Sequence, residues 1–285
     1  MIISVSRRCD IPRFAFGWFL ERLDAGFVDV KNPFNPRQVR RVPLLPCEGS
    51  VFAFWTREPA SILSHAEDLE RRGYNFYVMT TLTAYPSVLE PNVPAAAAVI
   101  QAMKGLAQKI TPQRVIWRYD PVFLSSLTDS EFHRRNFAHL AAQLNGAVKR
   151  VIVSVYDRYS AAERRLAALE RSGVLERSPH NGAALDPACR QLLAELSHIA
   201  RSQGMEIQSC AEEGMAELGI PAGACIDGEY IARLFGLNAP GRDKGQGRPL
   251  CRCAPSVDIG AYGNCPAGCV YCYGLWKSAG SVQCV

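Results

Sequence analysis

The chain has 285 residues, of which 48% are hydrophobic and 21% charged, and this balance excludes disorder as its general state. The 32 Lys and Arg against 27 Asp and Glu give a net charge of +5, which is compatible with a phosphate-bearing or nucleic-acid partner but does not require one. No stretch approaches the roughly 20 apolar residues that cross a bilayer, and the opening apolar segment is too short for a signal peptide. We therefore expect a cytoplasmic protein without membrane contact.

Short β-branched or aromatic runs alternate with amphipathic segments along the first 209 residues. The expected strands have the composition of buried parallel strands and lie at 2–5, 27–30, 51–56, 75–82, 114–119, 149–155 and 205–209. The expected helices lie near 14–25, 60–72, 95–109, 129–144, 160–172 and 187–203. This alternation predicts repeated βα units and a full or partial (β/α) barrel of parallel strands.

Residues 210–285 differ from the barrel core of residues 1–209, because they are rich in Gly, Pro and Cys and have one short helix pattern at 228–236. We expect them to complete the barrel as a cysteine-rich C-terminal segment that binds one or more clusters. Residues 256–260 predict a strand beside residues 2–5. The Gly/Pro-rich stretch 236–250 predicts a mobile loop.

Eight of the eleven cysteines follow position 209. In a compartment that keeps thiols reduced, such crowding indicates metal rather than disulfides. Cys265, Cys269 and Cys272 have the spacing C-x3-C-x2-C, which can wrap an iron–sulfur cubane and leave its fourth iron without a cysteine. A closed zinc site is the alternative for this loop.

Four further cysteines in the same segment are Cys210, Cys225, Cys251 and Cys253. Four is the number that a second cluster or a structural zinc ion requires. We prefer an auxiliary iron–sulfur cluster, while zinc and plain buried thiols stay open as alternatives. Cys284 is expected to be a free thiol near the C-terminus.

The cysteine loop, with the aromatic Tyr271 directly before its last cysteine, resembles the signature of the radical S-adenosylmethionine superfamily. The resemblance implies a [4Fe-4S] cluster whose open iron binds S-adenosylmethionine, and reductive cleavage of that cofactor to a radical that abstracts hydrogen from an unknown substrate. It also implies a reducing electron donor such as ferredoxin or flavodoxin. In most members the loop follows the first strand, so its place near the C-terminus predicts a permuted barrel.

Segments spread over almost the whole chain resemble the family catalogued as domain of unknown function 1848. They are SRRCDIP at 6–12, NPFNP at 32–36, FWTREP at 54–59, VIWRYDP at 115–121, SCAE at 209–212 and CAPSVDIGAYGNCPAGCVYCYG at 253–274. This resemblance implies a radical S-adenosylmethionine-like protein and does not identify its substrate. Cys9 stands where the family pattern favours threonine, so we expect no essential role for its thiol. The FWT and WRYDP segments also resemble parts of spore photoproduct lyase-like enzymes.

Charged residues end several of the expected strands, where parallel barrels collect functional side chains. Arg118 can grip the carboxylate of S-adenosylmethionine while Asp120 holds the guanidinium in place. Glu212 and Tyr271 are further candidates for cofactor binding. A structural ion pair between Arg118 and Asp120, and a role for Glu212 in the first turn of a helix, are the alternatives.

Arg7, Arg8 and Asp10 follow the first expected strand and are the candidate catalytic residues. Two adjacent arginines at a barrel rim suit an anionic substrate. The alternative is that one arginine pairs with Asp10 and the other lies in solvent.

Two functions of different classes are consistent with these patterns. One is a radical S-adenosylmethionine enzyme, and the other is a zinc-stabilised binding protein, with nucleic acid as a possible partner. Metal identity separates them, because iron with labile sulfide supports the enzyme and zinc alone supports the binding protein.

Overall fold

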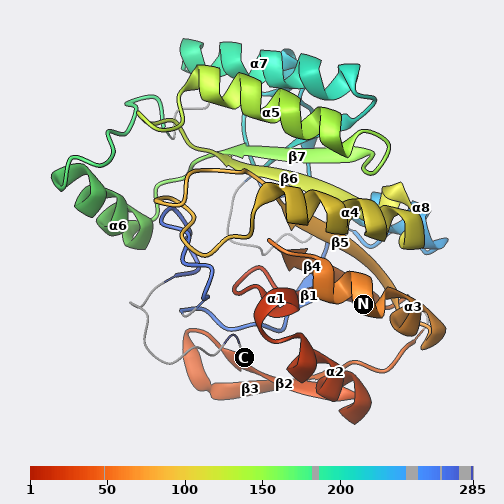
Figure 1. Ribbon diagram of the computed structural model, residues 1–285. Coiled ribbons are helices and arrows are strands. Elements are labelled where there is room, and N and C mark those ends of the chain that lie inside the picture. Colours follow the sequence, from red (N-terminus) through yellow and green to blue (C-terminus); the bar gives the residue numbers. More distant parts are fainter. Residues whose placement is uncertain (48, 182–185, 242–249, 264, 276–283, 285) are drawn as a thin grey trace.

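An eight-stranded parallel sheet organises the chain, and it curls into an open half-barrel (Figure 1). The computed structural model describes residues 1–47, 49–181, 186–241, 250–263, 265–275 and 284. The sheet has the order β10-β1-β4-β5-β6-β7-β8-β9. Its strands are β1 (Ile2–Val5), β4 (Val51–Thr56), β5 (Asn75–Thr81), β6 (Val115–Val122), β7 (Arg150–Val155), β8 (Glu206–Cys210), β9 (Ala222–Gly223) and β10 (Ser256–Asp258). The edge strands β9 and β10 do not pair with each other within the described residues, so the predicted barrel is partial.

Helices follow most of the strands, as the alternating pattern predicts. They are α1 (Ile11–Phe14), α2 (Phe16–Ala25), α3 (Ala60–Arg71), α4 (Ala96–Ile110), α5 (Ser130–Leu144), α6 (Ser160–Arg171), α7 (Pro187–Ser202) and α8 (Gly228–Phe235), with short 3-10 turns η1 (Pro112–Arg114) and η2 (Ala216–Leu218). Side-chain caps fix several starts: the Asp129 carboxylate accepts from Phe132 N at 2.7 Å to begin α5. No helix of the described residues is long and apolar enough to cross a membrane.

One expected strand forms, but it does not belong to the parallel sheet. Residues 27–30 are predicted to be a buried parallel strand, but β2 (Phe27–Asn32) pairs antiparallel with β3 (Asn35–Pro43) in a separate two-stranded hairpin. Asp29 in this run is exposed and forms two hydrogen bonds of 2.8 Å with Arg41 of β3. A parallel strand buried on both faces has no place for such a pair, and the hairpin does.

The C-terminal segment adds an edge strand to the sheet at the position that the sequence predicts. β10 lies parallel to β1, with Ile3 opposite Val257 and Ser4 opposite Asp258. The short helix pattern at 228–236 corresponds to α8. Most of the expected mobile loop at 236–250 falls on residues 242–249, which lie outside the described residues. The division at residue 209 stays a prediction, since β9 and β10 both belong to the main sheet.

Two apolar layers enclose the sheet. The outer layer joins α2, α3, α4, α5 and α7 to the strands and contains the stacked pair Trp117 and Phe137, whose ring centroids are 4.7 Å apart. The inner layer packs Tyr77 and Ile116 of the strands against Ile231 of α8 and the Cys225 and Cys253 segments. The concave face is therefore filled by the C-terminal segment, and polar chemistry is left to the edge where the strands end.

Gly260 is required by a close approach between β10 and the residue after β1. A Cβ atom at this position would lie 2.2 Å from Oγ of the buried Ser6. We expect Gly260→Ala to lower the free energy of unfolding by about 1–3 kcal/mol, the usual cost of overpacking. Urea denaturation measures this. Gly17→Ala is the matched control, since it meets nothing within 4 Å inside α2 and should be neutral or stabilising. Equal stability of both variants would contradict the prediction.

Because His133 is buried, we expect the free energy of unfolding to fall at acidic pH. Its ring is buried on α5, contacting the Tyr119 hydroxyl at 2.8 Å and the Phe123 carbonyl at 3.1 Å, and burial lowers its pKa to about 4. Because the unfolded chain takes up this proton near pH 6.5, stability is complete above that pH and falls by about 3 kcal/mol as the pH drops toward 4. Chemical denaturation between pH 7 and 4 checks this slope. His133→Gln should flatten it, whereas His139→Gln, exposed on the same helix, should leave it unchanged.

Candidate functional site

The residues that the sequence singles out gather at the carboxyl edge of the sheet. Arg7, Arg8 and Asp10 directly follow β1, and the loop of Cys265, Cys269 and Cys272 follows β10, the neighbour of β1. Farther along the same edge, Arg118 and Asp120 belong to β6, and Cys210 ends β8 two residues before Glu212. The topology therefore brings both cysteine groups and the charged candidates to one side of the half-barrel.

Asp258 joins the two ends of the chain beneath this edge. Its carboxylate accepts from Ser4 Oγ at 2.8 Å, Ser6 Oγ at 2.5 Å, Arg7 N at 2.8 Å and Gly260 N at 3.0 Å, and its side chain is 2% exposed. The Nε atoms of Arg7 and Arg8 lie 3.6 and 3.8 Å from it. Both arginines are thus oriented by Asp258, whereas the alternative prediction from the sequence paired one of them with Asp10.

Asp10 has a different position and role from its neighbours. Its carboxylate caps α1 by accepting from Arg13 N at 3.1 Å, and it accepts from Arg57 N at 2.7 Å. Burial raises its pKa to about 6 despite these bonds. The side chain ties the start of α1 to the end of β4.

The three thiols of the first cysteine loop are free and lie close together in the fold. Cys269 is buried, Cys265 and Cys272 are half-buried, and Gly274 N points at Cys272 Sγ from 3.3 Å. Burial raises the pKa of Cys265 to about 11 and that of Cys269 to about 12. The neutral thiol is therefore favoured at Cys265 and Cys269, and any metal that binds these two sulfurs must displace their protons.

Two side chains from distant parts of the sequence hold the backbone of this loop. Arg165 of α6 donates from Nε to Val270 O at 2.9 Å and from Nη1 to Leu275 O at 2.6 Å, and it also contacts the Cys272 carbonyl. Asn92 Nδ2 donates to Pro266 O at 2.9 Å. Fixing the carbonyls in this way sets the direction of the three cysteine side chains.

A buried polar network lies directly beneath the loop. Arg57, which follows β4, donates from Nη1 to Glu90 at 2.6 Å and to Thr83 at 2.9 Å, and from Nη2 to the Tyr271 hydroxyl at 2.5 Å. Thr83 and Tyr271 also donate to Glu90, whose side chain is 2% exposed. The Arg57 charge counteracts the effect of burial on the pKa of Cys269. The hydroxyl of Tyr271 is thus part of the support of the loop.

The second cysteine group is more compact. The Sγ atoms of Cys210 and Cys225 are 2.8 Å apart, and Ile226 N lies 3.4 Å from Cys253 Sγ. Cys225 and Cys253 also interact through their side chains, and Cys251 packs in the same apolar cluster. The structure therefore gathers the four cysteines, while a second cluster or a zinc ion at this position stays a prediction.

Arg118 supplies the positive charge of this group. Its Nη1 lies 2.7 Å from Cys225 Sγ, its Nη2 contacts Asp120, and its guanidinium lies 4.8 Å from the Trp55 ring centroid. Hydrogen bonds with the Cys210 and Cys253 thiols, and then the charge of Arg118, hold the pKa of Cys225 well below its usual value.

Glu212 and Asp120 bind neighbouring strands at this edge. The Glu212 carboxylate accepts from Val155 N at 3.1 Å, and Asp120 accepts from the Ser154 hydroxyl. Both carboxylates therefore brace the end of β7 in the structure.

Arg7 connects the two cysteine groups electrostatically. Burial lowers its pKa, but the charges of Asp258, Tyr273, Cys253 and Cys225 outweigh this effect, so the pKa is raised. Tyr273 belongs to the tail of the first loop, and its hydroxyl donates to Arg7 O at 2.8 Å. The surroundings of Arg7 are therefore shared by both groups.

One cysteine prediction is wrong. Cys284 is expected to be a free thiol, but it forms a disulfide with Cys9, with Cα atoms 5.4 Å apart. Both residues are buried, at 3% and 4% exposure. They lie 275 positions apart in the sequence, and Cys284 also accepts a hydrogen bond at its carbonyl from Ala261 N at 3.0 Å.

Sequence reasoning missed Glu90 and Arg165 and gave Asp258 no role. Glu90 stands in a stretch without a regular element, and Arg165 is one of many charged residues on an amphipathic helix. The sequence does mark Asp258 as unusual, since it is an acidic residue between the apolar Val257 and Ile259 of an expected strand.

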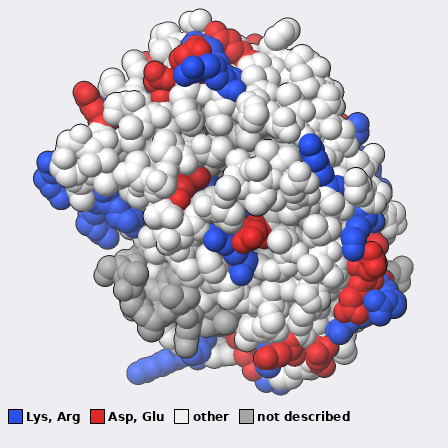
Figure 2. Space-filling model, viewed as in Figure 1, with Lys and Arg blue, Asp and Glu red and all other residues white. Residues whose placement is uncertain are grey.

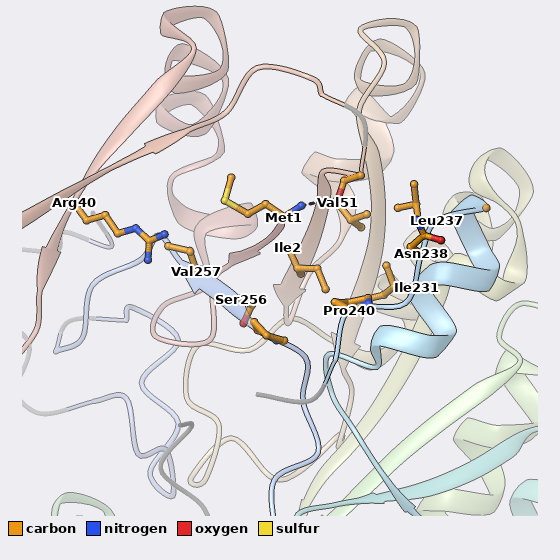
Figure 3. A pocket seen from close by; sticks show the side chains of 13 residues that line it. Met1, Ile2, Arg40, Val51, Ile231, Leu237, Asn238, Pro240, Ser256 and Val257 are labelled. Atoms are coloured by element: carbon orange, nitrogen blue, oxygen red, sulfur yellow. Dashed lines mark hydrogen bonds between the residues drawn. The ribbon is translucent and has the colours of Figure 1, made fainter. Parts of the chain in front are cut away.

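A cavity of about 790 Å³ lies at the opposite edge, where β1, β4 and β10 begin (Figure 3). It is lined by backbone and apolar side chains such as Ile2, Val51 and Ile231, and among the described residues of its lining Arg40 has the one ionisable side chain. This cavity has few groups that could perform chemistry, so the cysteine-bearing edge is the better candidate site.

The comparisons with known proteins agree with the sequence motifs. No curated protein matches the chain significantly. The family profile described as Domain of unknown function (DUF1848) matches residues 2–274, which include both cysteine groups and all eight strands of the main sheet. The chain therefore belongs to the DUF1848 family.

Proposed function

We propose that this chain is a radical S-adenosylmethionine-type enzyme whose [4Fe-4S] cluster is held by Cys265, Cys269 and Cys272. The observation that carries the proposal is three free thiols in one loop at the carboxyl edge of a parallel half-barrel, where βα-barrel enzymes place their active sites. The donor set fits, because cysteine thiolates are the ligands of such clusters.

The C-x3-C-x2-C spacing of this loop in the sequence supports a cluster. Each cysteine of a [4Fe-4S] cluster binds a different iron, so the sulfurs need not converge on one point. Gly274 N beside Cys272 Sγ adds a hydrogen-bond donor of the kind that tunes cluster potentials.

When bound, the reduced cluster supplies the electron that cleaves the sulfonium of S-adenosylmethionine and yields the radical that abstracts hydrogen from the substrate. The electron would come from a donor such as ferredoxin or flavodoxin. Arg57 favours the thiolate form of Cys269, while Arg165 and Asn92 hold the loop backbone in place. Tyr271 acts through the buried network, by fixing the segment between Cys269 and Cys272.

The remaining candidates suit the binding of S-adenosylmethionine or an anionic substrate beside this loop. Arg7, whose surroundings include both cysteine groups, and Arg118, beside Cys225, carry positive charge and would attract a carboxylate. Arg8 is half-buried, donating from Nη1 to Gly260 O at 3.1 Å. Asp120 holds Arg118, and Glu212 is the acidic residue that would face an amino group.

Metal analysis joined to a product assay tests the proposal. The full chain, purified without oxygen, should contain about four irons with matching sulfide. Dithionite with S-adenosylmethionine should then yield 5′-deoxyadenosine. Iron-free protein that retains zinc, or loaded protein that forms no nucleoside, would overturn the proposal.

A second candidate function, nucleic-acid binding, is favoured by the β2–β3 hairpin. Lys31, Arg37 and Arg40 are exposed on it and have no ion-pair partner among the described residues, and Phe34 at its turn is 85% exposed. Basic side chains project from this end of the molecule in Figure 2. A two-stranded ribbon with free cations suits a phosphate backbone.

Fluorescence anisotropy with labelled duplex and single strands tests this second candidate. Binding should weaken as salt rises, and replacing the three cations by glutamine should reduce the salt dependence by about 0.7–0.9 per lost phosphate contact. Unchanged binding in that variant would exclude the hairpin as the nucleic-acid surface.

A further inference from the structure

The second cysteine group has a geometry that favours sulfur–sulfur chemistry. The 2.8 Å between Cys210 Sγ and Cys225 Sγ lies closer to a disulfide bond, about 2.05 Å, than to the roughly 3.8 Å between two thiolates on one tetrahedral zinc ion with Zn–S bonds of about 2.3 Å. The two sulfurs need to approach by less than 1 Å to bond.

The surroundings polarise the pair. Arg118 Nη1 lies 2.7 Å from Cys225 Sγ, and this guanidinium is itself held by Asp120, with its side chain 9% exposed. A buried cation at this distance stabilises a thiolate. Cys225 is 5% exposed, whereas Cys210 at the end of β8 is half-buried. Cys210 is therefore the more exposed residue of the pair.

We propose that Cys210 and Cys225 form a redox-active thiol pair that exchanges with low-molecular-weight disulfides. The pair shares one proton, which passes from Cys210 to Cys225 as the Cys210 sulfur attacks the external disulfide. The external S–S bond breaks, a mixed disulfide forms on Cys210, and the departing thiolate takes the proton from Cys225. The Cys225 thiolate then attacks the Cys210 sulfur, forms the internal disulfide and releases the second thiolate.

This exchange balances without any group from the first cysteine loop. Two electrons leave the protein pair, and the external disulfide is reduced to one thiol and one thiolate, which takes its proton from water. Cys253 interacts with Cys225 through its side chain, and its sulfur lies 3.4 Å from Ile226 N, but it takes no covalent part in the exchange. The proposal can therefore be tested independently of the cluster proposed at Cys265, Cys269 and Cys272.

The test uses the full chain, reduced and handled without oxygen, and oxidised glutathione as the probe. After rapid alkylation, peptide mass spectrometry should show a Cys210–Cys225 linked peptide, which dithiothreitol reverses. Cys225→Ser should trap glutathione on Cys210, and Cys210→Ser should leave Cys225 without an adduct. Arg118→Met should slow formation of the linked peptide at least tenfold.

The control is Cys189→Ser, which removes a buried free thiol in α7 and should leave the rate of Cys210–Cys225 linkage unchanged. Three results would overturn the proposal. They are linkage of Cys225 to Cys253 in place of Cys210, unlinked Cys210 and Cys225 after full oxidation of the glutathione pool, and a zinc or iron content that the wild-type chain retains and Cys225→Ser loses.

Discussion

Replacing any one of Cys265, Cys269 and Cys272 by alanine should reduce 5′-deoxyadenosine formation to the background seen without protein. A [4Fe-4S] cluster that already lacks one cysteine ligand has no spare thiolate in the loop, so a second bare iron leaves it unstable. The measurements are iron and sulfide content, the visible absorption of the reconstituted protein and the nucleoside assay. The first two report on the cluster independently of activity.

Two cysteine variants serve as matched controls for this result. Cys47→Ala removes an exposed thiol whose sulfur contacts the Ser50 hydroxyl at 2.7 Å, far along the chain from either cysteine group. Cys251→Ala removes a member of the second group and should likewise spare nucleoside formation. Retained activity and iron in the alanine variants of the first loop would place the cluster elsewhere and end the proposed mechanism.

The fold could be predicted from the sequence because its signals are local. Buried strands such as Val51–Thr56 are runs of apolar residues, and amphipathic helices between them fix a parallel sheet. Even the pairing of β10 with β1 follows from a strand pattern at 256–260. The exception is the β2–β3 hairpin, where Asp29 and the turn-forming NPFN at 32–35 were the signals of an exposed ribbon.

The candidate site could be predicted only where its residues are neighbours in the sequence. The spacing of Cys265, Cys269 and Cys272 can be read directly, since one loop contains all three. Their supports cannot, because Glu90 and Arg165 reach the loop only through the path of the folded chain. The same holds for the Cys9–Cys284 disulfide, which joins residues 275 positions apart.

The second cysteine group could be predicted from the sequence only in part. Counting four leftover cysteines suggested a shared site, but the count does not say which sulfurs touch. The parallel pairing of β8 with β9 sets Cys210 opposite Gly223, and this register brings Cys225 to the Cys210 sulfur. Arg118 reaches them from β6, two strands away in the sheet. The contact thus depends on the topology of the sheet.

Arg57→Met should lower the free energy of unfolding by about 3–5 kcal/mol, because it leaves a buried carboxylate without its cation. Glu90 is 2% exposed, and in the variant its carboxylate would keep the hydroxyls of Thr83 and Tyr271 as its side-chain partners among the described residues. Urea denaturation measures the change. The loop between Cys269 and Cys272 should also loosen, since Tyr271 loses a hydrogen bond, and iron content after reconstitution should fall with it.

Two further variants separate the lost charge balance from lost packing. The double variant Arg57→Met with Glu90→Gln removes both charges and should recover part of the stability that Arg57→Met loses. Arg41→Met breaks an arginine–carboxylate pair on the exposed hairpin and should leave the unfolding midpoint nearly unchanged, because solvent screens that pair. If the double variant proved no more stable than Arg57→Met, the packing of the arginine side chain would explain the loss, and the buried network would hold the cysteine loop by shape rather than by charge.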